Sequence, residues 1–225
     1  MSSTGQARRR YNADGRRAQA RATRERILET ARSLFVEQGY AGTSIAQIAA
    51  AAGVSTPTVF AGFRSKVNLL KEATETTLVG DAEPVPLAER PQMRHVHEGD
   101  TAREVLERLA ELIAEAAPRV CPMFAVVLAA ADADPEIAEL ARTLDRHRLT
   151  GAAQLAGTVG RRLGVDDPTQ LAEIRDTIWT MNSPQLYGLL VVQRGWSPER
   201  YGAWIARALV ALVTPDPHLG AIAQS

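Results

Sequence analysis

The chain has 225 residues, of which 45% are hydrophobic and 5% aromatic, and its formal net charge is zero. The single cysteine, Cys121, excludes an internal disulfide. The longest apolar run, MFAVVLAAA at residues 123–131, is too short for a membrane span, and no apolar segment follows the basic N-terminus as in a secretory signal. We therefore expect a globular, cytoplasmic protein with no membrane partner, and the abundance of alanine favours helices.

The charges are unevenly distributed along the chain. Residues 1–71 contain 12 Lys and Arg against 4 Asp and Glu, whereas the remaining residues contain 14 against 22. A basic end on an acidic body suggests a polyanionic partner for that end. The plainer interpretation is a solvated tail. Residues 1–18 show no apolar periodicity, which predicts a flexible basic arm.

Two helices are predicted after this arm. From about residue 21, apolar residues recur at helical spacing until Gly39, which is expected to end the helix as a C-terminal cap. Ser44 and Gln47 then fit a capping box that opens a second helix. Gly53 is expected to end this second helix.

A third and a fourth helix follow closely. Ser55 is the expected N-cap of a short third helix, and Pro57 lies in its first turn, where no hydrogen bond is lost. Ser65 is the expected N-cap of the fourth. We predict a three-helix domain over residues 19–64 and a connecting helix over residues 65–79.

Residues 80–225 are predicted to form a second, larger helical domain. Residues 80–100 contain three prolines and little periodicity, so we interpret them as a linker that holds the domain boundary. Residues 119–131 are almost wholly apolar and should be deeply buried. Helix starts are predicted at Thr101, Asp134-Pro135, Asp167-Pro168 and Ser197-Pro198. Ser183-Pro184 marks either a new helix or a kink in a long one.

The second and third helices have the spacing of a helix-turn-helix motif. Ala49 is small, as a helix crossing requires, and Gly53 can adopt the positive φ of a sharp turn. In this motif the second helix enters the DNA major groove. Ser55, Thr56 and Thr58 carry short hydroxyls that suit phosphates and base edges. Lys66 can neutralise a phosphate as a point charge. The alternative is a structural three-helix unit without a DNA role.

The segment ILETARSLFVEQGYAGTSIAQIAAAAGVSTPTVFAGFRSKVNLL resembles the DNA-binding domain of the tetracycline-repressor (TetR) family of bacterial transcription regulators. Its motifs are F-x-x-x-G-Y, T-S-I-x-x-I-A, A-G-V-S, T-V-F-x-x-F and S-K-x-x-L-L. The resemblance implies an all-α fold, with an N-terminal helix-turn-helix domain and a C-terminal helical domain for ligand binding and dimerisation. The implied DNA-binding residues are Thr43, Ser44, Ser55, Thr56, Thr58, Phe60 and Lys66.

Two positions depart from the family pattern. Phe60 falls where the family usually has a tyrosine whose hydroxyl binds phosphate, and Gly62 falls where a histidine or another large residue is common. The arginines of the predicted arm offer a replacement, because basic arms can reach an adjacent minor groove. These arginines are Arg8, Arg9, Arg10, Arg16 and Arg17.

The resemblance also implies that the second domain binds a small effector and forms a homodimer. The segment IWTMNSPQLYGLLVVQRGW at residues 178–196 carries more apolar residues than one helix usually buries, which favours the homodimer. Mixed apolar and polar residues are typical of a ligand pocket, although core packing is the simpler interpretation of each of them. The candidate pocket residues are Leu106, Met123, Phe124, Val127, His147, Trp179, Asn182 and Tyr187.

An enzyme is not predicted. The sequence has no G-x-S-x-G motif, P-loop or dinucleotide fingerprint, so no catalytic residue and no cofactor is assigned. His95 and His97 form only a fragment of a metal site, and no metal is expected. The sequence predicts a repressor that binds a palindromic double-stranded DNA operator as a homodimer and is released by a small molecule. The alternatives are a DNA-binding regulator without a ligand, or a ligand-binding protein with a degenerate DNA-binding domain.

Overall fold

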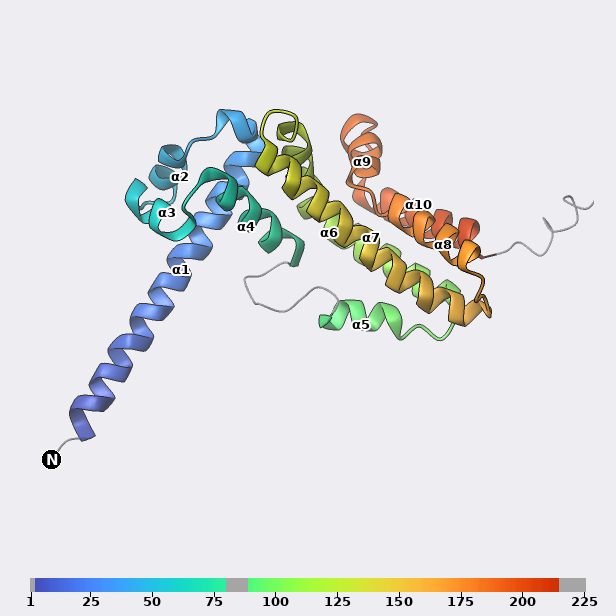
Figure 1. Cartoon of the computed structure of the whole chain (residues 1–225), viewed down its shortest axis with the longest axis horizontal. Coiled ribbons are helices and arrows are strands. Elements are labelled where there is room, and N and C mark those ends of the chain that lie inside the picture. The colour runs from blue at the N-terminus through green and yellow to red at the C-terminus, as the bar shows by residue number, and fades with distance from the viewer. Residues whose placement is uncertain (1–2, 80–88, 215–225) are drawn as a thin grey trace, which may run out of the picture. The chain divides into compact units, whose positions relative to one another are not determined.

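The computed structural model describes residues 3–79 and 89–214, and every regular element in these two ranges is helical (Figure 1). The chain divides into two compact units, Met1–Ala82 and Glu83–Ser225. The predicted all-α fold class is therefore confirmed. Residues 80–88, which hold the first part of the predicted linker, lie outside the described residues.

The first helix, α1 (Ser3–Gly42), is longer than the sequence indicated. We expected a flexible arm over residues 1–18, but the helix runs back to Ser3. Extension of a formed helix adds a hydrogen bond for each residue it orders, and Ala, Arg and Gln are favourable helix residues. Regular helix geometry breaks at Gly39, whose φ is 73°, as predicted.

Three further helices complete the N-terminal unit: α2 (Ile45–Ala51), α3 (Thr56–Phe63) and α4 (Lys66–Val79). Their inward faces share a small core with α1, in which Phe35, Ile48 and Val59 are each 0% exposed. Leu69 and Leu70 of α4 are equally buried. This core fixes α2 and α3 against α1.

The second unit contains seven elements in its described part. They are α5 (Pro91–His97), α6 (Ala102–Ala130), α7 (Pro135–Leu163), α8 (Pro168–Met181), α9 (Pro184–Tyr187), the π-helix η2 (Gly188–Gln193) and α10 (Pro198–Val213). Helix α6 packs against α7 and α10, and α7 packs against α8. Their shared core includes an edge-to-face pair of Tyr187 and Tyr201, with ring centroids 5.3 Å apart.

The predicted helix starts of the second unit are confirmed. The side chains of Asp134, Asp167, Ser183 and Ser197 each accept a backbone N–H bond from the first turn that follows, with proline in that turn. At the start of α6, the Thr101 side chain accepts the Glu104 N–H, without a proline in the first turn. The open question at Ser183 is answered, because α8 ends at Met181 and a new helix begins at Pro184.

The predicted linker is only partly irregular, because α5 lies within it. Pro91 occupies the first turn, where its missing N–H costs nothing. Met93 is 8% and Val96 1% exposed, so this short helix is held by apolar contacts with the second unit's core. Two buried residues in seven gave too weak a periodicity to be recognised in the sequence.

Helix α6 continues without interruption through Pro118 and Pro122. The expected deep burial of residues 119–131 was wrong: Met123 is 0% exposed, but Leu128 is 40% exposed, so only one face is covered. By length and composition α6 could cross a membrane. It packs against α7 and α10 within the second unit.

Helices α6 and α10 approach each other closely at Gly202. A Cβ atom at this position would lie 2.6 Å from Cβ of Ala114, closer than carbon atoms can approach. The glycine is therefore required by the proximity of the two helices, because its φ is not in the left-handed region.

Candidate functional site

The α2–turn–α3 segment has the geometry of a helix-turn-helix. The two helices are bent by 111° at a short break, within the usual range for this motif. Gly53 has a φ of 65°, which a side chain would make costly. The turn also retains its hydrogen bonds, since the Val54 N–H donates to the Ala49 carbonyl at 2.9 Å. The bend is therefore fixed by backbone conformation.

Both helices of the motif are capped by serine hydroxyls. Ser44 forms the full predicted capping box with Gln47. Ser55 Oγ accepts the Thr58 N–H at 3.3 Å and lies 2.8 Å from Thr58 Oγ1. Only one of these two hydroxyls can donate to the other, so one hydroxyl hydrogen is left for an outside acceptor such as a phosphate.

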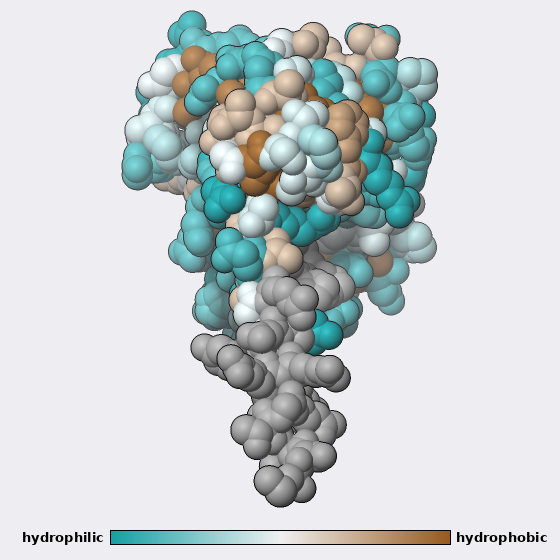
Figure 2. Space-filling view, turned by 90° about the vertical axis from the view of Figure 1, so that its left-hand side faces the viewer, coloured by the Kyte–Doolittle hydropathy of each residue, from teal (hydrophilic) through white to brown (hydrophobic). Residues whose placement is uncertain are grey.

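Helix α3 has distinct inner and outer faces. Val59 and Phe63 are 0% and 2% exposed and pack inward. Thr58 and Ala61 are exposed on the outer side, and Phe60 is 48% exposed. Figure 2 shows the side of the molecule on which α2 and α3 lie, where neutral and weakly apolar residues gather among hydrophilic ones. The outer face of α3 is thus uncharged and small, apart from Phe60.

The structure corrects the expected role of Thr43. Its side chain is only 1% exposed, and its hydroxyl lies 2.9 Å from the Gly39 carbonyl and 3.1 Å from the Leu34 carbonyl. A buried hydroxyl that serves the end of α1 cannot also touch the DNA backbone. The Thr43 side chain therefore does not face DNA, and the predicted contact of this residue with the DNA backbone stays a prediction for its main chain, whereas Ser44 is exposed.

Lys66 also has an internal role. Its ammonium donates to the carbonyls of Tyr40 and Thr43 at 2.8 and 2.9 Å, and it lies 3.9 Å from the centroid of the Tyr40 ring. A phosphate would have to share this ammonium with the two carbonyls. A DNA contact by Lys66 stays a prediction, but its first function is to join α4 to the end of α1.

Two arginines of α1 have a similar role at the other helices. Arg24 donates to the Gly62 carbonyl at 3.1 Å, and its guanidinium lies 4.4 Å from the centroid of the Phe63 ring. It also pairs with Glu72. Arg26 donates to the Ala52 carbonyl at 2.9 Å. A cation near a helix C-terminus is attracted to the negative end of the helix dipole. These contacts therefore help to hold α2 and α3 in place.

Sequence reasoning missed Arg64. It is exposed and has a φ of 65°, a strained conformation for a residue with a side chain. The cause is local: α3 ends at Phe63, and Ser65 already caps α4 by accepting the Asn68 N–H at 3.1 Å. One residue must therefore turn the chain. The sequence already showed that the third helix ends close to Ser65, the expected N-cap of the fourth, and this short spacing was the available signal.

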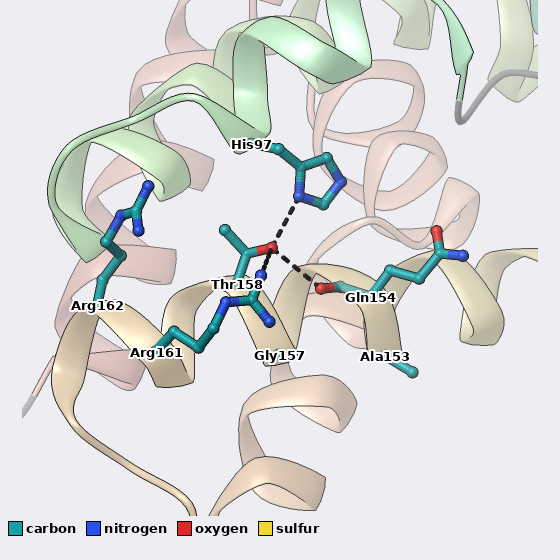
Figure 3. A pocket seen from close by; sticks show the side chains of 7 residues that line it. All are labelled: His97, Ala153, Gln154, Gly157, Thr158, Arg161 and Arg162. Atoms are coloured by element: carbon teal, nitrogen blue, oxygen red, sulfur yellow. Dashed lines mark hydrogen bonds between the residues drawn. The ribbon is translucent and has the colours of Figure 1, made fainter.

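The predicted pocket residues of the second unit do not form one group. Leu106, Met123, Phe124, Val127 and Tyr187 are buried in cores, and Trp179 is half-buried. His147 and Asn182 are exposed, so the structure does not support their place in a ligand pocket of the isolated chain. The structure does form an open hollow between α5 and α7, but none of these eight residues lines it (Figure 3). The six non-exposed residues stay candidates for a ligand pocket.

The environments of Cys121 and His97 do not indicate a reactive thiol or a metal site. Burial raises the pKa of the Cys121 thiol to about 12, so the reactive thiolate is scarce at neutral pH. His97 Nδ1 lies 2.9 Å from Thr158 Oγ1. Within residues 3–79 and 89–214, no group of three His, Cys, Asp or Glu side chains is placed to hold a metal ion.

The N-terminal unit has the helix-turn-helix arrangement that occurs in a class of DNA-binding proteins, and a larger helical unit follows it. Within that class, residues 27–73 match the family model for bacterial regulatory proteins of the tetR family. This match confirms the resemblance to the TetR family for the N-terminal unit.

Solved structures extend the similarity to the whole fold. The chain is similar to a protein from Syntrophomonas wolfei str. Goettingen described as a TetR-family transcriptional regulator, with a TM-score of 0.68, 20% identity and coverage of 86% of this chain and 96% of that one. It is also similar to the transcriptional regulator FadR from Bacillus subtilis, solved with stearoyl-CoA (TM-score 0.65, 17% identity, coverage 84% and 97%). A third similar structure is a protein from Saccharomonospora viridis described as a transcriptional regulator and solved with choline (TM-score 0.63, 24% identity, coverage 84% and 95%). No curated protein sequence matches the chain.

Proposed function

We propose that the protein is a cytoplasmic transcriptional regulator, most simply a repressor, that binds duplex DNA as a homodimer and is released by a small effector. The observation that carries the proposal is the outer face of α3. This face is exposed and uncharged, and the exposed hydroxyls of Ser55 and Thr58 lie at its N-terminal end. Such a face allows the helix backbone to approach the base edges closely, while hydroxyls and backbone N–H groups bind phosphate.

The proposed DNA contacts follow from exposure. Ser44, Ser55 and Thr58 are exposed and supply hydroxyls, and Thr56 is half-exposed at the start of α3. Phe60 offers an apolar ring to a thymine methyl group, since it has no hydroxyl for phosphate. Arg64 supplies a cation at the far end of the same helix. The arginines of residues 8–17 are proposed to add phosphate or minor-groove contacts.

The direct test is an electrophoretic shift with duplex fragments from the genomic neighbourhood of the coding sequence. We expect a specific complex whose logarithmic affinity falls linearly with logarithmic salt concentration, because bound arginines release counterions from the DNA. A protein that leaves all such fragments unshifted at low ionic strength would be a ligand-binding protein with a degenerate DNA-binding unit.

The homodimer is proposed from apolar residues that the isolated chain leaves uncovered. Leu189 and Val192 of η2 are 49% and 72% exposed, and Leu212 of α10 is 61% exposed. Exposed large apolar side chains on neighbouring elements are typical of a subunit interface. Dimerisation would also present two α3 helices to half-sites about 34 Å apart.

Replacing Val192 with glutamate tests this interface. We expect the dimer to dissociate at micromolar concentration, because two charges would be buried at the apolar contact, and DNA affinity to fall with it. Sedimentation velocity measures the oligomeric state. The matched control is Leu149→Glu on α7, which is 38% exposed. A V192E protein that sediments as the wild type does would place the interface elsewhere.

The effector is proposed by analogy with the two neighbours solved with stearoyl-CoA and choline. A ligand can release DNA only to the extent that it binds the non-DNA-binding conformation more tightly. Release of a preformed complex by a small molecule separates this mechanism from a regulator that has no ligand.

A further inference from the structure

A hollow of about 550 Å³ opens on the second unit between the end of α5 and the last turns of α7 (Figure 3). Its lining comes from two elements that are far apart in sequence. The seven residues are His97, Ala153, Gln154, Gly157, Thr158, Arg161 and Arg162. We call this hollow the α5–α7 groove.

The floor of the groove lies low because the α7 residues there are small. Ala153 and Gly157 are four positions apart and lie on the same face of the helix. Neither has a side chain longer than a methyl group, so the helix backbone forms the floor. Arg161 continues the same row, and Arg162 lies beside it. Small residues thus open a space next to two guanidinium groups.

A hydrogen-bond network orients one of these guanidinium groups. Arg161 Nη2 donates to Thr158 Oγ1 at 3.1 Å, and His97 Nδ1 lies 2.9 Å from the same oxygen (Figure 3). The Thr158 hydroxyl lies 3.3 Å from the Gln154 carbonyl, to which it can donate. Thr158 is itself only 4% exposed. The position of Arg161 is therefore set by a buried hydroxyl, as in a preorganised binding site.

The cations of the groove lack carboxylate partners in the described part of the chain. No Asp or Glu oxygen of residues 3–79 or 89–214 forms an ion pair with Arg161 or Arg162. Other arginines of α7 differ, since Arg142, Arg146 and Arg148 all pair with acidic residues. Burial and the charge of Arg161 lower the pKa of His97, so its imidazole is neutral at pH 7. The net charge facing the groove is positive.

A structural role explains only part of this arrangement. Arg162 Nε donates to the Gly99 carbonyl at 2.9 Å, and cations near the end of α7 suit the helix dipole. An arginine has five N–H donors. These contacts use one donor of Arg162 and one of Arg161, and leave the others toward the hollow or the solvent. They do not explain why small residues keep the adjacent surface open.

We propose that the α5–α7 groove binds the phosphate or carboxylate group of a small anionic ligand, with Arg161 and Arg162 as the binding residues and Thr158 as the residue that positions Arg161. As the effector site, the groove rests on the proposed regulatory function, and it then assigns an acidic effector. As an anion site, it stands on its own geometry. A guanidinium group binds both kinds of oxyanion through parallel N–H bonds.

The experiment is a titration of the full-length protein, without DNA, with inorganic phosphate and separately with butyrate. Binding is followed by isothermal calorimetry and by the imidazole NMR signals of His97, which are assigned from their loss in His97→Gln. We expect saturable binding of at least one anion and a shift of the His97 signals. The variants Arg161→Gln and Arg162→Gln should each weaken binding about tenfold or more, because a hydrogen bond to a charged group is lost. Both arginines are exposed, so the fold should persist.

Two further variants make the result specific. Thr158→Val keeps the side-chain volume but removes the hydroxyl, and it should weaken binding without removing a charge. Arg142→Gln, an exposed arginine of the same helix that pairs with Glu139, should leave binding unchanged. Equal loss in R142Q and R161Q, displacement by chloride at equal concentration, or absence of binding by either anion would overturn the proposal. If the protein binds the anion but the anion does not release DNA, the groove is an anion-binding site but not the effector site.

Discussion

Replacing Ala61 with glutamate is expected to abolish specific binding to duplex DNA at physiological ionic strength while leaving the fold intact. Ala61 is exposed at the centre of the outer face of α3, opposite the buried Val59 and Phe63. A carboxylate there would face base edges and phosphates, and a like-charge contact in an interface costs several kcal/mol. An electrophoretic shift at several salt concentrations measures the loss, and circular dichroism checks that helix content is unchanged.

The matched control is Ala61→Gln, which has nearly the same size without the charge. It should retain more affinity than A61E, because an amide can donate to a phosphate or a base. Equal affinity of A61E and the wild type would show that α3 does not face DNA, and the proposed function would then lose its principal support. Equal loss in both variants would indicate a steric limit instead of a charge effect.

The second large effect is expected at the contact of α10 with α6. Gly202→Ala should destabilise the protein by about 1–3 kcal/mol, because its new methyl group would overlap the Ala114 methyl group and force the helices apart. In the double variant with Ala114→Gly the overlap is gone. We therefore expect the double variant to be more stable than the sum of the two single changes predicts. Urea unfolding of all four proteins gives this coupling free energy.

The cycle separates packing from helix propensity. Alanine is intrinsically better than glycine in a helix by about 1 kcal/mol, which favours G202A and opposes A114G. These local contributions cancel in the coupling term, so only the contact between the two helices remains. A coupling term of zero would show that the helices separate at no cost, and that the close approach does not determine their packing.

Helix starts were the most predictable feature of this chain. Ser44, Ser55, Asp134 and Ser197 all cap helices where the sequence indicated. A cap involves neighbours within three residues and therefore needs no knowledge of the fold. The turn at Gly53 was equally local. This is why the α2–turn–α3 segment could be described in advance.

Features that depend on distant contacts could not be predicted. Helix α5 lies in a proline-rich segment and is held by two buried residues, Met93 and Val96. Thr43 carries a hydroxyl that could bind a phosphate. Only the three-dimensional structure shows that this hydroxyl already bonds to carbonyls of α1. The α5–α7 groove joins His97 to Thr158 across 61 positions of sequence. No local pattern reports such a distance.

The carbonyl contacts of Arg24, Arg26 and Lys66 affect how a scan of the basic residues would be interpreted. We expect that truncating any of the three would release the end of a helix and let α2 and α3 tilt, so the proposed DNA binding would weaken as it would if a DNA-contacting residue were lost. A genetic screen alone would assign all three residues to the proposed DNA-binding surface. Their carbonyl contacts hold the helices that carry the proposed DNA surface, so we expect substitutions elsewhere that stabilise these helices to restore binding without restoring the missing charge.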